Sequence, residues 1–193
     1  MRQLRRGLVG AVAPLAVAAL LVSGGPAAMG ADDTTDRWGG DKGGGHHDTA
    51  TITSEPWGAT EDGTAVERYT LSNRGMTVRI LTYGGIIQSL DVPNGRKDPV
   101  NVVLGFADLQ GYLDNNNPGP YFGALIGRYG NRIANGQFEL DGTTYNLPIN
   151  NDPNSLHGGF NGFDTKVWTA TPIQNNGTVA LQLNYLSPDG EEG

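Results

Sequence analysis

Residues 64–92, TAVERYTLSNRGMTVRILTYGGIIQSLDV, decide the fold class. Apolar and polar residues alternate along 64–72, along 76–82 and along 86–92, and glycine-containing breaks separate the three runs. A period of two is typical of β-strands with one buried face. The first run is expected to have Val66, Arg68 and Thr70 on one side and Glu67, Tyr69 and Leu71 on the other. The second is expected to share one face among Met76, Val78 and Ile80, and the third among Ile86, Leu90 and Val92.

The clearest hairpin follows at 137–147, QFELDGTTYNL. Asp141-Gly142 is typical of a two-residue type I′ turn, and this register places Phe138 opposite Tyr145. Further strands are expected at 101–106, 121–127 and 179–186, and a helical turn or two at 107–113. Short strands at this spacing predict an all-β protein, an antiparallel sandwich or barrel.

Composition excludes several classes of function. Glycine makes up 30 of 193 residues, about 16% against an average of roughly 7%, without a collagen period. The net charge of −7 argues against a nucleic-acid partner, which needs a basic face. The absence of cysteine excludes disulfides, thiolate zinc sites, iron–sulfur clusters and cysteine nucleophiles.

The first thirty residues are typical of a secretory signal peptide. Arg2, Arg5 and Arg6 precede a 15-residue apolar run, and small residues lead to an acidic step at Asp32. We expect cleavage after Gly30, by the general secretory or the twin-arginine route, and a secreted product with no membrane attachment. An uncleaved anchor is the alternative, but the run is shorter than the ~20 residues of a spanning helix.

Residues 31–50 are expected to be a flexible, low-complexity lead-in to a domain at 51–193. His46-His47 before Asp48 resembles part of a metal site, but neighbouring residues point in different directions and no third ligand is near. We therefore expect no metal site.

Two segments are more polar than a sheet requires. The first, GRYGNRIANG at 127–136, has Arg donors and Asn amides suited to hydroxyl-rich or carboxylate ligands. The second, at 150–168, contains His157, Gly158-Gly159 and three aromatic residues that would form a platform for a sugar ring: Phe160, Phe163 and Trp168. The alternatives are loop side chains that cap the backbone, a structural histidine and core aromatics.

The ordered segments LTYGGIIQSLDVP, VVLGFADLQGYL, PYFGALIGRYGNRIANGQFELDGTTYNL, PNSLHGGFNGFDTKVW and SPDGEEG resemble the aldose 1-epimerase (galactose mutarotase) family. The resemblance covers about residues 65–193. It implies a large antiparallel β-sandwich, of which 51–193 would be the N-terminal part. It also implies interconversion of the α and β anomers of free hexoses, without a cofactor.

In the family, a general-base Glu and a general-acid His belong to motifs in the second half of the fold. The resemblance therefore implies no catalytic residue in this chain, and Glu191 and Glu192 match neither motif. It implies three sugar-binding residues here, Asn131, Arg132 and His157. We expect the chain to be an incomplete, inactive fragment, with sugar preference and oligomeric state left open.

Two other functions remain open. A secreted sugar-binding β-sandwich module would need neither base nor acid. A hexose-6-phosphate 1-epimerase would need a cationic phosphate pocket, for which Arg128 is the available residue.

Overall fold

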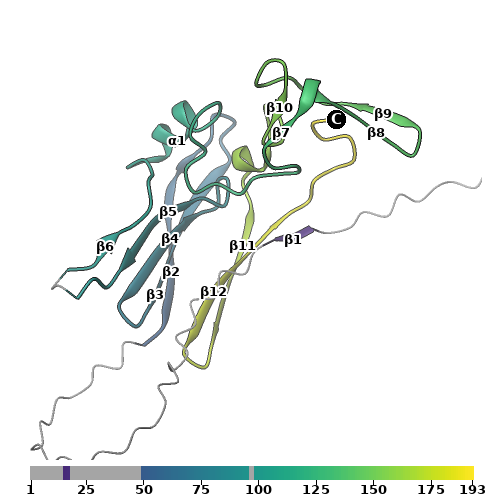
Figure 1. The fold of residues 1–193 in the computed structure, drawn as a ribbon. Coiled ribbons are helices and arrows are strands. Elements are labelled where there is room, and N and C mark those ends of the chain that lie inside the picture. Colours follow the sequence, from purple (N-terminus) through teal and green to yellow (C-terminus); the bar gives the residue numbers. More distant parts are fainter. Residues whose placement is uncertain (1–14, 18–48, 96–97) are drawn as a thin grey trace, which may run out of the picture.

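The computed structural model describes residues 15–17, 49–95 and 98–193 (Figure 1). Its largest layer is a five-stranded antiparallel sheet of order β2-β3-β4-β5-β6. The strands are β2 (Thr51–Ala59), β3 (Ala65–Asn73), β4 (Met76–Leu81), β5 (Ile87–Val92) and β6 (Val100–Asn101).

A second antiparallel sheet has the order β1-β12-β11. Its strands are β1 (Leu15–Val17), β11 (Thr169–Asn175) and β12 (Thr178–Tyr185). In Figure 1 the long β11–β12 ribbon runs beside the larger sheet. Apart from 15–17, the predicted signal peptide lies outside the described residues, as do His46, His47 and Asp48.

The two sheets share a core, as in a sandwich. Tyr69 and Leu71 of β3 pack in one buried cluster with Leu181 and Leu183 of β12, together with Phe163 and Trp168. This packing explains why the alternating runs at 64–72, 76–82 and 179–186 form strands. The predicted all-β sandwich class is confirmed.

A second apolar cluster lies under helix α1 (Leu109–Asn115). Val66, Leu81 and Ile86 pack there against Leu109 and Tyr112. The helix begins where the Asp108 carboxylate accepts a hydrogen bond from the Gly111 N–H at 2.8 Å, an N-cap. The helical turn expected at 107–113 is confirmed.

The predicted hairpin is also confirmed. Strands β8 (Gln137–Leu140) and β9 (Thr143–Asn146) pair with Phe138 opposite Tyr145, and these rings stack with centroids 5.0 Å apart. Asp141 and Gly142 both have positive φ, as a type I′ turn requires.

Two predicted strands are wrong. At 101–106 only Asn101 belongs to a strand, and Val102 and Leu104 are 57% and 70% exposed, not buried. The Asn101 side chain ends the strand, because its Oδ1 accepts from the N–H groups of Leu90 and Val103. Residues 121–127 contain no strand, and Tyr121 and Gly123 have positive φ, which is incompatible with one.

One predicted face is also wrong. Ile86 packs in the cluster under α1, whereas Leu90 packs against the core between the sheets. The register of β4 and β5 shifts between Arg79 and Ile80, and such a bulge places neighbouring residues on different faces.

Among the residues that the structure describes, no helix is long and apolar enough to cross a bilayer.

Candidate functional site

A short two-stranded ladder joins the two polar segments. Strand β7 (Arg132–Ile133) pairs antiparallel with β10 (Ser155–Leu156). Next to the ladder the His157 N–H donates to the Asn131 carbonyl at 3.0 Å. The structure therefore brings together the three predicted site residues Asn131, Arg132 and His157, which lie up to 26 positions apart in sequence.

The His157 ring is fixed by a second bond to the same residue. The Asn131 N–H donates to His157 Nδ1 at 2.9 Å. An imidazole nitrogen that accepts carries no proton, so in the neutral ring the proton is assigned to Nε2. Burial, and then the Arg132 guanidinium, lower the pKa of His157. At neutral pH the ring is therefore uncharged and presents an Nε2–H donor.

Arg132 is exposed and anchored at one side of its guanidinium. Its Nε donates to Asn151 Oδ1 at 2.8 Å, and Nη1 lies 3.4 Å from Asn131 Oδ1. A guanidinium carries five N–H donors in a rigid plane, so these two bonds orient the group and leave donors for a ligand.

The backbone of the site is unusual. Asn131 and His157 both have positive φ, 63° and 56°. Nearby Tyr121, with φ 53°, packs its ring edge-on against the His157 ring with centroids 4.9 Å apart. Left-handed non-glycine residues are uncommon, and they concentrate at functional sites.

Gly158 is required by its close approach to backbone, and Gly159 has a positive φ of 88° that favours glycine. A Cβ at Gly158 would collide with the Gly127 carbonyl, and one at Gly159 would collide with the Glu192 carboxylate. The loop after His157 is thus packed tightly between the 127–132 segment and the end of the described chain.

The predicted aromatic platform is wrong in two of its three residues. Phe163 is buried and Trp168 is only 2% exposed, and both belong to the core between the sheets. Trp168 also donates its ring N–H to the Phe163 carbonyl at 3.1 Å. Phe160 is 56% exposed, so it alone remains available at the surface.

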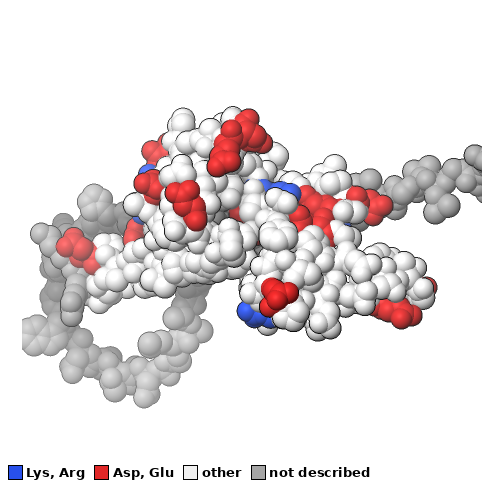
Figure 2. All heavy atoms as spheres, turned by 90° about the horizontal axis from the view of Figure 1, so that it is seen from above, with Lys and Arg blue, Asp and Glu red and all other residues white. Residues whose placement is uncertain are grey.

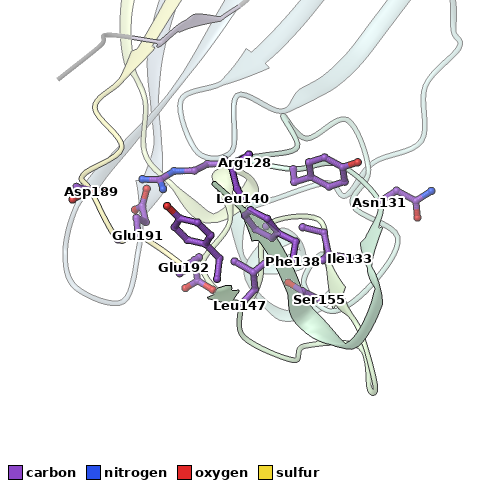
Figure 3. A pocket seen from close by; sticks show the side chains of 15 residues that line it. Arg128, Asn131, Ile133, Phe138, Leu140, Leu147, Ser155, Asp189, Glu191 and Glu192 are labelled. Carbon is purple, nitrogen blue, oxygen red and sulfur yellow. The ribbon is translucent and has the colours of Figure 1, made fainter. Parts of the chain in front are cut away.

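Arg128 is held by the segment that follows β12. Its Nε donates to Ser187 Oγ at 2.9 Å, and Nη2 donates to the Pro188 carbonyl. Arg128 lines a cavity of about 460 Å³ between the β8–β9 hairpin and residues 189–193. Figure 3 shows Phe138, Leu140 and Leu147 around this cavity, with the Asn131 side chain pointing away from them.

Asp164 lies buried behind the loop of His157. Neither carboxylate oxygen makes a hydrogen bond of normal geometry to a described residue, although the Asp164 backbone N–H and the Asn117 amide are close enough to lower its pKa. Burial is the larger effect and raises the pKa of Asp164 to about 6. Within the described ranges, no three His, Cys, Asp or Glu side chains gather as a metal site.

Sequence reasoning missed the residues that hold the loops. Asn150 and Glu192 bond to the segment after β10, and Glu191 forms an ion pair with Lys166 at 2.8 Å. The density of Asn in 150–154 was the available signal, because Asn side chains often bond to nearby backbone. No local signal points to Glu192, whose contacts lie 31 and 32 residues away.

Comparisons with known proteins agree on one family. The aldose 1-epimerase family model matches residues 67–193. Galactose mutarotases of Rattus norvegicus and Homo sapiens are 48% and 47% identical over 131 residues, 68% of this chain and 36% of theirs. The chain thus spans just over a third of the length of these curated relatives.

Among solved structures, the galactose 1-epimerase of Lactobacillus acidophilus NCFM matches with a TM-score of 0.64 and 26% sequence identity. The match covers 75% of this chain and 41% of that chain. Together with the family model over most of the chain, these similarities show that the chain belongs to the aldose 1-epimerase family.

Proposed function

We propose that the natural protein carrying this sequence is an aldose 1-epimerase, an isomerase that interconverts the α and β anomers of free hexoses such as galactose and glucose. Residues 131–132 and 157 would bind the sugar. The observation that carries the proposal is the neutral His157, which is fixed on Asn131 and lies beside the anchored guanidinium of Arg132.

The reaction explains why these residue types suit the site. To exchange anomers, the C1 hydroxyl loses a proton, the ring oxygen gains one, and the ring opens to an aldehyde that rotates and recloses. The Nε2–H of His157 would donate to an oxygen at or near the ring, and the Arg132 N–H groups would donate to sugar hydroxyls. Donors placed in this way orient the sugar for proton transfer.

Proton transfer itself needs one general base and one general acid. The family resemblance assigns these roles to a Glu and a His in motifs that this chain does not contain. Glu191 is a poor base because Lys166, Tyr185 and Ser187 bind its carboxylate, and its pKa is lowered, although burial alone would raise it. These 193 residues would therefore supply sugar binding and orientation.

Polarimetry of freshly dissolved α-D-galactose and α-D-glucose tests the proposal, with spontaneous mutarotation subtracted. A hydrogen bond contributes roughly 0.5–1.5 kcal/mol between neutral groups and roughly 1.5–3 kcal/mol where one group is charged, which corresponds to about 2- to 13-fold and about 10- to 150-fold in rate. We expect His157→Ala to lower kcat/KM of the natural protein by at least the smaller factor and Arg132→Ala by at least the larger one, with a cooperative melt in both variants. Arg128→Ala should cost less, since Arg128 bonds to Ser187 and Pro188. Wild-type protein that does not accelerate mutarotation would refute the proposal.

A sugar-binding module without catalysis is the second candidate. It is favoured by one observation: the described site offers donors for sugar hydroxyls without a neighbouring base and acid. Saturable galactose binding with no acceleration of mutarotation by the natural protein would support this candidate instead. A sugar-phosphate epimerase has less support, because the Arg128 guanidinium is already engaged.

A further inference from the structure

Three side chains from separate segments hold the loop that carries His157. Asn150 Nδ2 donates to the carbonyls of Leu156 and Gly159 at 2.9 and 2.8 Å, and its Oδ1 accepts from the Leu156 N–H at 2.7 Å. Asn117 Nδ2 donates to the Phe160 carbonyl at 3.1 Å. The third is Glu192, the only one of the three that carries a charge.

Glu192 binds the loop with both carboxylate oxygens. Oε2 accepts from the Phe160 N–H at 3.0 Å, and Oε1 accepts from Asn161 Nδ2 at 2.9 Å. The carboxylate also lies against Gly159, where a side chain would collide with it. Hydrogen bonds of a charged acceptor to backbone N–H groups are roughly twice as strong as neutral ones.

The segment that carries Glu192 is itself anchored. The Glu191 N–H donates to the Pro188 carbonyl and the Gly193 N–H to the Gly190 carbonyl, each at 3.2 Å. Next to it, Glu191 pairs with Lys166 at 2.8 Å and accepts from the Tyr185 hydroxyl at 2.5 Å. Glu192 therefore connects a fixed turn to the loop of His157.

We propose that Glu192 is a positioning residue that fixes the 157–161 loop, and through it the orientation of the His157 ring. Its importance for catalysis rests on the function proposed above, whereas its effect on the ring does not. Glu192 acts through its hydrogen bonds to the loop.

Loss of the Glu192 carboxylate would change the surroundings of His157 directly. The Phe160 N–H and the Asn161 amide would both lose their acceptor, three and four residues from His157. His157 has a positive φ of 56° and keeps its Nδ1 bond to Asn131 only while the loop stays in place. A loosened loop would weaken that bond and let the ring sample both tautomers.

The first test is nitrogen NMR of the histidine rings in the natural protein that carries this sequence, with the His157 signals identified by their loss in His157→Ala. We expect wild type to show the Nε2–H tautomer. Glu192→Ala should give mixed tautomers and a pKa closer to 6.5. Glu139→Ala on the exposed hairpin is the matched control and should leave the ring unchanged.

Glu192→Gln separates hydrogen bonding from charge. Its amide oxygen can still accept from the Phe160 N–H, and the Asn161 amide can rotate to accept from its NH2 group. We expect the Gln variant to keep the wild-type ring signals. Unchanged signals in Glu192→Ala, or equal damage in the Gln and Ala variants, would overturn the proposal.

Should Glu192→Ala fail to give a cooperative melt, Asn161→Ala replaces it, because that variant removes only the Oε1 bond. A smaller change of the ring signals in the same direction is expected, and no change would contradict the proposal.

The second readout is kcat/KM for mutarotation by the natural protein. Misplacement of a binding group by about 1 Å can cost about 100-fold, so we expect Glu192→Ala to lose roughly 10- to 100-fold and Glu192→Gln to stay near wild type. If wild type shows no mutarotation, the proposed function fails while the ring signals still decide the role of Glu192.

Discussion

His157 is prepared for hydrogen-bond donation by two neighbours. The backbone N–H of Asn131 fixes the tautomer, and burial together with Arg132 keeps the ring neutral. The sequence identified these three residues only through a resemblance, because composition and spacing left a structural histidine equally open. What local sequence could not indicate is the bond that selects Nε2–H, since it depends on a ladder between distant segments.

The lowered pKa of His157 leads to a prediction for stability. The unfolded chain has the ordinary pKa of 6.5 and binds the proton more readily than the folded chain. The stability contributed by His157 is therefore present above pH 6.5 and is lost as the pH falls below it towards the folded value. Ring NMR should find His157 titrating below 6.5, and Arg132→Ala should move the titration upward. A His157 pKa above 6.5 would contradict this account.

For Asp164 we predict the opposite dependence of stability on pH. Burial raises its pKa from 3.8 to about 6, so the folded state holds the proton more tightly than the unfolded state. The stability contributed by Asp164 is fully present below about pH 3.8 and is lost as the pH rises through about 6, a difference of roughly 3 kcal/mol.

Asp164→Asn removes this titration. We expect the variant to have a higher Tm than wild type at pH 7.5 and a similar Tm near pH 4, measured by thermal melts across this range. A difference in Tm that does not change with pH would show that burial of the charge is not the cause.

Elements with local causes were predictable. The 137–147 hairpin follows from Asp141-Gly142, and α1 follows from the N-cap at Asp108. The apolar runs at 101–106 and 121–127 have no period, and a short apolar run does not reveal its own backbone conformation. In the first segment the conformation depends on the side-chain hydrogen bonds of Asn101. In the second it depends on the positive φ values of Tyr121 and Gly123.

The hairpin turn allows a clean test of backbone conformation. Gly142 has φ 73°, and an added Cβ would meet nothing within 4 Å. Gly142→Ala should therefore lower the free energy of unfolding only by the penalty for an alanine in a left-handed conformation, about 1 kcal/mol. Gly130→Ala is the matched control, since its φ is not positive and its Cβ would make an ordinary contact with Ile126. Urea unfolding should show the loss for Gly142→Ala alone. Equal effects of the two substitutions would argue against a type I′ turn.

In the whole molecule, the apolar core that stabilises the fold and the candidate site lie in different places. The two sheets enclose the apolar core, while the candidate site lies on short ladders and loops beside them. The face in Figure 2 carries scattered acidic side chains and few basic ones, which agrees with the net charge of −7. The sequence predicted the sandwich from alternation, but the meeting of segments 127–132, 150–161 and 187–193 is a property of the folded chain.

Export is a further prediction at this scale. The Arg-rich start and the apolar run before Gly30 motivate cleavage between Gly30 and Ala31. N-terminal sequencing of protein from the culture medium should begin at Ala31. Recovery of Met1 in a membrane fraction would contradict the prediction.

Titration of the natural protein that carries this sequence with D-galactose, followed by NMR of the His157 ring and the Arg132 side chain, tests the central claim most directly. The account predicts saturable shifts of the His157 Nε2–H and the Arg132 guanidinium signals, and loss of these shifts in Arg132→Ala. Absence of any saturable shift at these two residues, or shifts confined to the cavity beside the β8–β9 hairpin, would contradict it.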